Sequence, residues 1–218
     1  MAEQSDTKAM NNTGKFITFE GIEGAGKSTQ ISRLKQYLED RNIECVTTRE
    51  PGGTDVSEVI REILLDKSLP AMHSDTELLL MFAARAEHLH KKILPALQQR
   101  QWVLCDRFTD ASYAYQGYGR GIDLQHLAIL EQWVQGDMRP DHVLIFDLPV
   151  EAGLARAGKR GDSDRFEEED IAFFTRVREG YLQRAEVYPD RYDVIDGSQT
   201  EASVWRAVEK IAAGWING

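Results

Sequence analysis

The sequence predicts an α/β fold, in which a parallel β-sheet is covered by helices on both faces. The main observation is that short β-rich runs alternate with amphipathic helical patterns along the chain, without an internal repeat. A length of 218 residues, with 42% apolar and 28% charged residues, also suits a globular chain with a well-sized core. The longest uninterrupted apolar run, Leu78 to Ala84, is much too short to span a membrane.

Charge and cysteine usage narrow the class of protein further. A net charge of −10 argues against a general nucleic-acid binder or a protein of anionic membrane surfaces. Cys45 and Cys105 both lie in apolar, strand-like runs, so we expect buried thiols instead of a disulfide or a metal pair. Residues 1–13 form a polar tail without an apolar signal core, and we expect residues 14–218 to form one cytoplasmic domain.

The first expected strand, Phe16–Phe19, is β-rich and closes at a glycine-rich loop. The helix after it is indicated by apolar residues at helical spacing, namely Ile31, Leu34 and Leu38. Ile43–Thr47 is the second expected strand, and it leads into the turn Pro51-Gly52-Gly53. The helix expected next carries a second set of apolar residues, namely Val56, Val59, Ile60, Ile63 and Leu64.

A long third helix is expected to begin at Ser74, because Ser74 and Glu77 have the spacing of a capping box. The helix continues through Arg85, and Pro95 is expected to bend it or to begin a separate last turn. The third strand, Trp102–Cys105, follows.

The second half of the chain continues the alternation. Asp123 is expected to cap a helix that stops near Gly136, and His142–Phe146 is the fourth strand. A basic helix over about 150–160 is followed by an acidic loop and a helix over about 167–186. The last expected elements are the strand Tyr192–Ile195 and a helix marked by Trp205, Val208, Ile211 and Trp215.

The strongest chemical signal is a complete G-x-x-x-x-G-K-[ST] motif, a P-loop, placed between the first strand and the first helix. Glycines let the backbone N–H groups curl around phosphates, and the helix N-terminus adds partial positive charge. Lys27 is expected to reach the β- and γ-phosphates and Ser28 to bind Mg²⁺. The alternative, an ordinary glycine-rich turn, fits this strand–loop–helix context poorly. The nucleotide-binding run is Gly21, Ile22, Glu23, Gly24, Ala25, Gly26, Lys27, Ser28 and Thr29.

Polar residues follow the ends of three strands, where ligands of open α/β sheets bind. They are Arg49-Glu50, Asp106-Arg107 and Asp147. Two arginines beside a P-loop suggest a second anionic group, such as an acceptor phosphate. The alternative is that each arginine pairs with a neighbouring carboxylate and only fixes its loop. Asp106 is a candidate to orient Mg²⁺ through water, or else a turn cap.

Two further features carry charge near the expected site. Glu23 would repel phosphates if it pointed at them, so it is expected to face a hydroxyl of the acceptor, or else solvent. A basic cluster suits a lid that covers the transferred phosphoryl group, although a solvated helix face is the alternative. The cluster consists of Arg156, Lys159, Arg160 and Arg165. The five histidines show no ligand spacing, and none is assigned a role.

With these residues in place, the sequence resembles the bacterial thymidylate kinase family of P-loop nucleoside monophosphate kinases, over essentially all of Lys15–Trp215. Few other P-loop kinases combine the Arg-Glu-Pro-Gly-Gly turn with an Asp-Arg strand end. The motifs that carry the resemblance are Phe19–Thr29, Thr48–Gly53, Asp106–Phe108, Ala114–Gly117 and Gly119–Gly121.

The resemblance implies a P-loop NTPase three-layer sandwich with a five-stranded parallel sheet and a short lid at about residues 156–167. It implies transfer of the ATP γ-phosphate to dTMP, giving dTDP in dTTP biosynthesis, with Mg²⁺ as cofactor and a homodimer as the assembly. Glu23 would bind the deoxyribose 3′-hydroxyl, and Phe82 would stack on thymine. The base edge would be read by Arg85, Ser112 and Gln116. The acceptor phosphate would lie among Arg49, Arg61 and Arg107, with Glu50 holding the arginine geometry.

The P-loop sequence also distinguishes subtypes of the family that this sequence resembles. The eukaryote-like form has an arginine directly after the acidic residue, where this chain has Gly24. The bacterial type supplies the cation from the lid instead, and Arg160 is expected to do so here, with Arg156 nearer the adenine. Two readings compete with this one. Another nucleotide kinase would differ only in the base pocket, and a nucleotide-dependent switch would have little use for two strand-end arginines.

Overall fold

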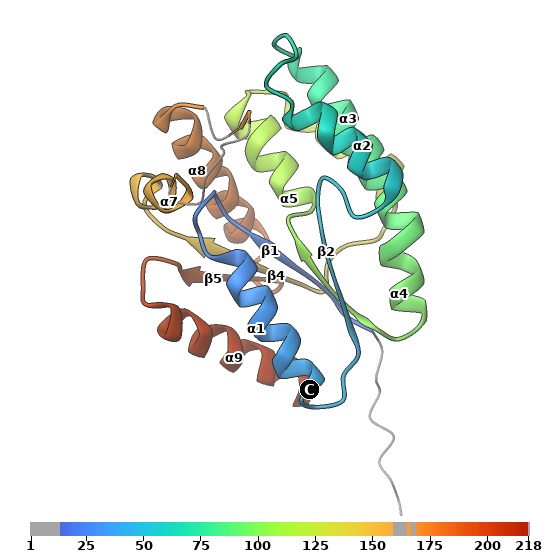
Figure 1. Cartoon of the computed structure of the whole chain (residues 1–218), viewed down its shortest axis with the longest axis vertical. Helices are drawn as coiled ribbons and strands as arrows, with labels where there is room; N and C mark the ends of the chain where they lie inside the picture. Colours follow the sequence, from blue (N-terminus) through green and yellow to red (C-terminus); the bar gives the residue numbers. More distant parts are fainter. Residues whose placement is uncertain (1–13, 159–164, 167–168, 218) are drawn as a thin grey trace, which may run out of the picture.

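A computed structural model of the chain describes residues 14–158, 165–166 and 169–217. The five expected strands form one parallel sheet in the order β2-β3-β1-β4-β5, with the P-loop strand at its centre (Figure 1). The predicted α/β architecture is therefore confirmed. The strands are β1 (Phe16–Glu20), β2 (Cys45–Arg49), β3 (Trp102–Asp106), β4 (His142–Asp147) and β5 (Tyr192–Asp196).

Strand ends and register bring the polar residues of the sequence to one edge of the sheet. The second strand begins and ends two residues later than expected, so that Arg49 is its last residue. Arg49 pairs in register with Asp106 of β3, and Asp106 pairs with Phe19 of β1. Because all strands are parallel, their carboxyl ends meet beside the P-loop, which is where an open α/β sheet binds ligands.

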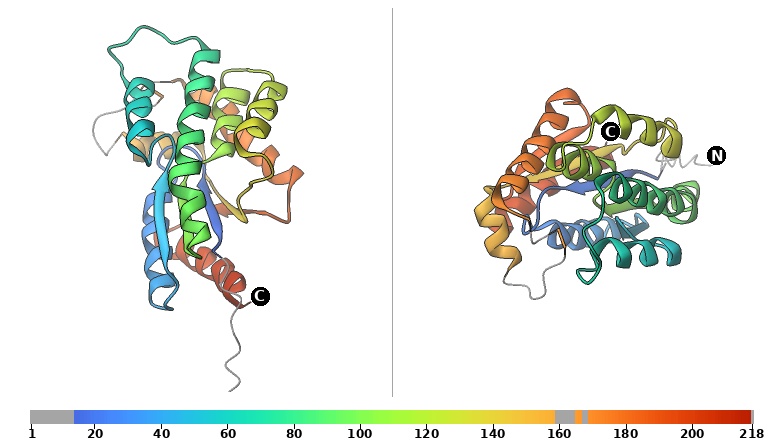
Figure 2. Two further views of the ribbon diagram at one scale, coloured as in Figure 1. Left: turned by 90° about the vertical axis from the view of Figure 1, so that its right-hand side faces the viewer. Right: turned by 90° about the horizontal axis from the view of Figure 1, so that it is seen from above.

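Helices lie on both faces of the sheet (Figure 2). On one face α1 packs with α9, and on the other lie α4, α5 and α8 together with the two π-helical segments η1 and η2. Pro95 lies in the first turn of α4, which continues the chain directly after η1. The helical segments are α1 (Lys27–Glu39), α2 (Asp55–Leu65), α3 (Ser74–His88), η1 (Leu89–Ile93), α4 (Leu94–Gln98), α5 (Thr109–Ser112), η2 (Tyr113–Gly119), α6 (Leu124–Gln135), α7 (Val150–Ala157), α8 (Ile171–Val187) and α9 (Glu201–Asn217).

Strand alternation divides the buried apolar side chains between the two faces of the sheet. Ile17 and Phe19 of β1 belong to the cluster that includes Leu34 of α1. Phe16 of β1 faces the other way and packs with Ile93 of η1. The central strand is therefore buried on both sides, which holds the P-loop that follows it on a rigid base.

The start of α3 differs from the capping box that the sequence predicts. His73 is the N-cap, and its Nδ1 accepts a hydrogen bond from the backbone N–H of Asp75 at 3.2 Å. Glu77 does not return to the helix end, because its side chain is buried and holds partners from other elements. The expected helix is present, but the glutamate that suggested its start has a different role.

The apolar residues that predicted α2 are largely exposed. Val56, Val59 and Ile63 are all exposed, whereas Leu64 is fully buried. The helical period was therefore correct, but most of this apolar stripe does not face the core.

Two boundaries near the basic cluster are also shifted. The expected basic helix corresponds to α7, which ends at Ala157, and the following helix begins at Ile171. Asp170 caps α8 by accepting from the N–H of Phe173 at 2.7 Å, as the acidic run before this helix suggested. The polar tail, residues 1–13, lies outside the described residues. Among the helices described, none has the length and apolar character needed to cross a membrane.

Candidate active site

The P-loop forms a turn of backbone between β1 and α1. Gly26 adopts a left-handed conformation at the N-cap of α1, with φ of 88°. Lys27 is buried, and its Nζ donates to the carbonyl oxygens of Gly21 at 3.0 Å and Ile22 at 3.1 Å. Burial, followed by the charge of the nearby Arg107, lowers the pKa of Lys27 to about 8 against the opposing effect of Asp106. The ammonium group is thus held inside the loop that would surround a phosphate chain.

Packing against α7 explains why Gly24 carries no side chain. Its φ is +72°, and a Cβ at this position would collide with the carbonyl oxygen of Gly153. An arginine at this place in the P-loop would require α7 to move. The absence of an arginine at this position, seen in the sequence, is therefore enforced by the fold.

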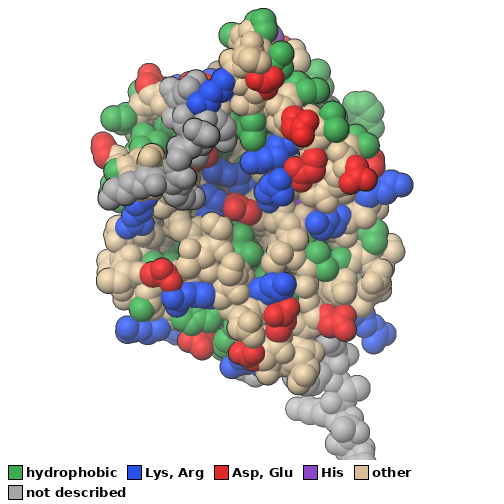
Figure 3. Space-filling model, viewed as in Figure 1, with side chains coloured by type: hydrophobic (Ala, Val, Ile, Leu, Met, Phe, Trp, Pro, Cys, Tyr) green, Lys and Arg blue, Asp and Glu red, His purple; other side chains and the backbone are tan. Residues whose placement is uncertain are grey.

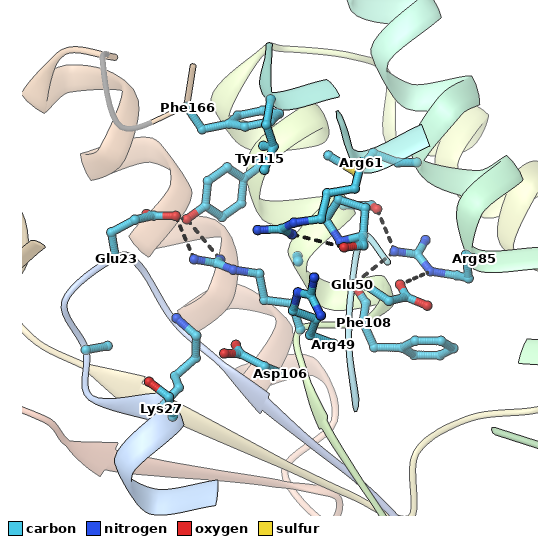
Figure 4. Close-up of a pocket in the computed structure, with 18 of the residues that line it drawn as sticks. Glu23, Lys27, Arg49, Glu50, Arg61, Arg85, Asp106, Phe108, Tyr115 and Phe166 are labelled. Carbon is cyan, nitrogen blue, oxygen red and sulfur yellow. Dashed lines mark hydrogen bonds and ion pairs between the residues drawn. The ribbon is translucent and has the colours of Figure 1, made fainter. Parts of the chain in front are cut away.

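A cavity of about 250 Å³ extends from the P-loop along the carboxyl ends of β2 and β3. Figure 3 shows Lys and Arg side chains gathered on the face where it lies. Figure 4 shows that Glu23, Lys27 and Asp106 lie at one end, with Arg85 and Glu50 toward the other. The lining residues come from the P-loop, β2, α2, α3, β3, α5, η2 and the segment at Phe166.

Glu23 and Arg107 meet at the junction between the P-loop and the rest of the cavity. Arg107 donates from Nη2 to Glu23 at 2.7 Å and from Nη1 to the hydroxyls of Tyr115 at 2.9 Å and Tyr181 at 3.2 Å. Burial raises the pKa of Glu23, but the charges of Arg107 and Lys27 and a hydrogen bond from Tyr115 outweigh it, so the pKa lies below its usual range. Glu23 is therefore a carboxylate that Arg107 and Tyr115 hold at this junction.

Arg107 has an unusual backbone for a residue with a side chain. Its φ is +68°, in the left-handed region. Its N–H donates to the carbonyl of Phe19 at 3.0 Å, which ties this turn to the end of β1. Strained positions of this kind concentrate at functional sites.

The two other predicted arginines belong to the same cavity. Arg49 forms an ion pair with Glu58 of α2 at 2.8 Å, and Arg61 donates to the carbonyl of Pro51 at 2.9 Å. Figure 4 shows both reaching toward the space near Tyr115. Each arginine has a protein partner on one side and the cavity on the other.

A buried network fixes the far end of the cavity. Glu50 accepts from Nε of Arg85 at 2.7 Å and is bonded to Nδ1 of His88 at 2.9 Å, and Nε2 of His88 is bonded to Thr48 at 2.7 Å. Nη2 of Arg85 donates to the hydroxyl of Ser112 at 2.9 Å. Its Nη1 is buried and has no partner among the described residues. Arg85 lines the cavity, so this unpaired donor belongs to a side chain at its wall.

Gln116 is held by a second buried network. Its Nε2 donates to Oε1 of Glu77 at 2.9 Å, and Oε2 of Glu77 accepts from Arg165 at 2.6 Å. Arg120 lies 3.4 Å from the same carboxylate and pairs with Glu169 at 2.6 Å. The sequence analysis grouped Arg165 with the basic cluster. In the structure its side chain is bound to Glu77 of α3.

Phe82 is the predicted site residue that the structure does not bring into the cavity. It is buried in a cluster with Leu78, Tyr113 and Leu127. The preceding residue, Met81, lines the cavity instead, together with Leu65 and Phe166. The Phe82 ring instead lies under the Arg85 guanidinium, with 4.6 Å between the Arg85 Cζ and the ring centroid.

The residues proposed for Mg²⁺ fit a hard, oxygen-binding cation. Asp106 lines the cavity beside Lys27, and its Oδ1 is buried without a partner among the described residues. Ser28 offers a hydroxyl at the first turn of α1. The described residues contain no cluster of three or more His, Cys, Asp or Glu side chains that could hold a metal ion.

The predicted lid, at about residues 156–167, lies only partly within the described residues. Arg156 donates from Nη1 to the carbonyl of Gly197 at 2.8 Å, which places it by the turn between β5 and α9. Arg160 and Lys159 lie outside the described residues. Sequence reasoning missed Tyr115, Tyr181, His88, Glu77 and Met81 as parts of this site. Of these, Tyr115 lay within a motif that had been singled out, and Glu77 had been singled out only as part of a helix cap.

Comparisons with known proteins agree with this geometry. The family model described as thymidylate kinase matches residues 19–208. A thymidylate kinase from Alkalilimnicola ehrlichii is 54% identical over 210 residues, covering 94% of this chain and 97% of that protein. One from Pseudomonas entomophila is 57% identical over 202 residues, covering 93% and 96%. The crystal structure of thymidylate kinase from Ehrlichia chaffeensis is similar with a TM-score of 0.74 at 38% identity, covering 91% of this chain and 98% of that one.

Proposed function

The chain belongs to the thymidylate kinase family, and we propose from this premise how its residues divide the transfer of the ATP γ-phosphate to dTMP. One observation carries the proposal. The P-loop and the arginine-lined acceptor region open into one cavity, and the Glu23–Arg107 pair stands where they meet. A donor phosphate chain and an acceptor phosphate could therefore lie side by side, which is what phosphoryl transfer without a covalent intermediate requires.

On the donor side, the P-loop N–H groups and Lys27 would surround the β- and γ-phosphates. Lys27 would exchange its bonds to the loop carbonyls for phosphate oxygens, so that a buried cation gains an anionic partner. Arg156 would lie near the adenine, because it is bound to the turn between β5 and α9. Arg160 stays our candidate for the lid cation that covers the transferred group.

Ser28 and Asp106 would hold Mg²⁺ on this side. When bound, the cation would bridge the β- and γ-phosphate oxygens and neutralise charge that develops on them. Asp106 would act directly or through water, and its unpartnered Oδ1 supports that role.

On the acceptor side, the phosphate of dTMP would bind among Arg49, Arg61 and Arg107. Glu23, once Arg107 turns to a phosphate, would be left with an acceptor oxygen for the 3′-hydroxyl of the deoxyribose. The base would lie at the far end, with the unpaired Nη1 of Arg85 at its edge. Met81 would provide the apolar wall that the sequence assigned to Phe82.

The first test measures ADP formation from Mg·ATP with a panel of acceptors, namely dTMP, dUMP, UMP, dCMP, dAMP, dGMP, thymidine and none. We expect strong turnover with dTMP and weak turnover with dUMP. Thymidine isolates the acceptor phosphate, because it keeps the base and lacks the group that the three arginines would bind. Equal ADP release with and without an acceptor would contradict the proposal and indicate a nucleotide-dependent ATPase.

We also propose a homodimer in the cytoplasm. The outer face of α2, α3 and α6 carries exposed apolar side chains, of which Trp133 is 82% exposed. Its other members are Val56, Val59, Leu79 and Ile129. Light scattering should give twice the 24.7 kDa mass of the chain, and Trp133→Glu should give the monomer. A monomeric wild-type protein would contradict this assembly. The two free cysteines agree with a reducing compartment.

A further inference from the structure

Glu77 is a buried carboxylate that the proposed reaction does not use, although it touches a residue of the base site. It is 1% exposed, and it lies on α3 two turns before Arg85. Its partners come from three other segments, namely Gln116 of η2, Arg120 and Arg165. A carboxylate held by two arginines is costly to bury, so its position calls for a function beyond packing.

The bond between Glu77 and Gln116 decides which end of the amide faces the cavity. A carboxylate can only accept hydrogen bonds, so the Gln116 group at 2.9 Å from Oε1 must be the NH₂ group. The amide oxygen of Gln116 is then turned away from Glu77 and has no partner among the described residues. Because Gln116 lines the cavity, the side chain offers the ligand an acceptor.

Arg85 offers the opposite character in the same cavity. Its Nη1 is a buried donor without a described partner. A donor beside an acceptor matches the keto and imide edge of thymine, which presents O4 as an acceptor and N3–H as a donor. Cytosine reverses both, with an amino donor at C4 and an acceptor at N3. The pair therefore discriminates between these bases only while the amide keeps its orientation.

We propose that Glu77 is the positioning residue that sets base specificity, by fixing the amide of Gln116 with its oxygen toward the base. Arg165 donates to the other oxygen of Glu77 at 2.6 Å and keeps this side chain in the required place. The inference rests on the proposed binding of the base beside Arg85 and Gln116, and it adds a residue from outside the cavity lining to the reading of that base.

The test compares kcat/KM for dTMP and for dCMP in Glu77→Gln and Glu77→Leu. In Glu77→Gln the single amide oxygen is claimed by Arg165, so the NH₂ group faces Gln116 and favours the flipped amide. In Glu77→Leu the amide loses its anchor. We expect the dTMP preference over dCMP to fall about tenfold or more in both, because a misoriented polar group is left unpaired against the base.

Arg120→Met is the matched control. It removes the 3.4 Å contact with Glu77 and the ion pair with Glu169, while the bonds of Glu77 to Gln116 and Arg165 remain. If Glu77 only stabilised the fold, all three variants would lose activity with both acceptors in parallel and the ratio would stay constant. The proposal expects the ratio to change in the Glu77 variants and not in Arg120→Met.

A double-mutant cycle separates this inference from the proposed function. In a Gln116→Leu background, Glu77→Gln should change the dTMP to dCMP ratio no further, because the amide that it orients is absent. A wild-type enzyme that does not prefer dTMP would contradict the proposed base site. A wild-type preference for dTMP that persists in folded Glu77 variants would overturn only the role of Glu77.

Discussion

The donor half of the cavity is built from one short run of consecutive residues, whereas the acceptor half is assembled from side chains of β2, α2, α3, β3 and η2. In the P-loop, the ligand-binding groups are mainly backbone N–H groups and one lysine, and their geometry follows from the glycines. On the acceptor side, each group is held by a partner that is distant in sequence, such as Glu50 for Arg85. A backbone site can therefore be recognised from a motif, but a side-chain site depends on its supporting network.

The largest expected effect is the loss of the P-loop lysine. Lys27→Ala should lower phosphoryl transfer to dTMP by about a thousandfold or more, because a preorganised cation at the phosphates is lost. Circular dichroism and thermal unfolding should show an intact fold, since the loop is shaped by backbone. Substantial kinase activity in the folded variant would contradict the comparison of the two halves, because phosphate binding by the donor half would then not depend on the lysine of the P-loop motif.

Glu20 lies beneath the junction of the two halves and links their stability to pH. It is fully buried, its Oε1 accepts from the N–H of Phe108 at 2.8 Å, and its Oε2 has no partner among the described residues. Burial, followed by the charge of Asp110, raises its pKa to about 8. The folded protein thus keeps a proton that the unfolded chain releases from about pH 4.5 upward, so stability is lost as the pH rises toward 8.

Glu20→Gln cannot ionise and keeps an acceptor for Phe108. The free energy of unfolding of Glu20→Gln, relative to that of the wild type, should therefore increase between pH 5.5 and pH 7.5, by up to about 1.4 kcal/mol per pH unit. Urea unfolding at the two pH values measures this difference. The exposed substitution Glu62→Gln is the control and should show no such gain. A constant difference between Glu20→Gln and wild type would mean that Glu20 is ionised throughout this range.

A pair of substitutions at His88 tests whether the acceptor half depends on its supporting network. Nδ1 of His88 donates to the Glu50 carboxylate, and in the neutral ring Nε2 accepts from Thr48. His88→Asn keeps a donor near Nδ1, whereas His88→Gln keeps a group near Nε2. We expect KM for dTMP to rise about tenfold in His88→Gln, equivalent to about 1.4 kcal/mol, and much less in His88→Asn.

The measurement for this pair includes kcat and the melting temperature. Since His88 acts through Glu50 on Arg85, kcat should change little and KM for ATP not at all. Equal effects of the two variants on KM for dTMP, in step with their loss of stability, would reduce His88 to a packing residue.

The same comparison explains which parts of the molecule the sequence could predict. The strands, their order of appearance and the P-loop follow from periodicity and from one motif, and both depend on neighbours in the chain. The roles of Glu77 and His88 depend on η2 and β2 lying against α3, which no local pattern encodes. Ser74 and Glu77 had the spacing of a cap, but a tertiary contact with Gln116 and two arginines used the glutamate instead.

Phe82 and Met81 also show that the sequence pattern alone does not reveal which side chain of a helix faces the cavity. Both are apolar neighbours on α3, and an aromatic ring is the more obvious partner for a base. Met81 lines the cavity, whereas Phe82 is buried in the cluster with Leu78 and under the Arg85 guanidinium, and α3 is fixed in this orientation by its packing against α2 and α6. The sequence could not show which of the two faces the cavity, because residues three and four positions before Arg85 both lie on its face of the helix.

The smallest expected effect concerns the pH dependence of nucleotide binding by the donor half. Because burial lowers the pKa of Lys27 to about 8, the ammonium form that phosphates require is depleted in the free enzyme above that pH. Affinity for Mg·ATP should fall about fourfold between pH 7 and pH 8.5, as the protonated fraction of a group with this pKa does. Titration calorimetry measures the affinity of wild type and of Lys27→Met for Mg·ATP at both pH values. Because the ionisation of ATP affects both proteins equally, the difference between them reports on Lys27. The variant should bind weakly with no such slope, whereas a slope shared by both proteins would assign the titration to a group other than Lys27.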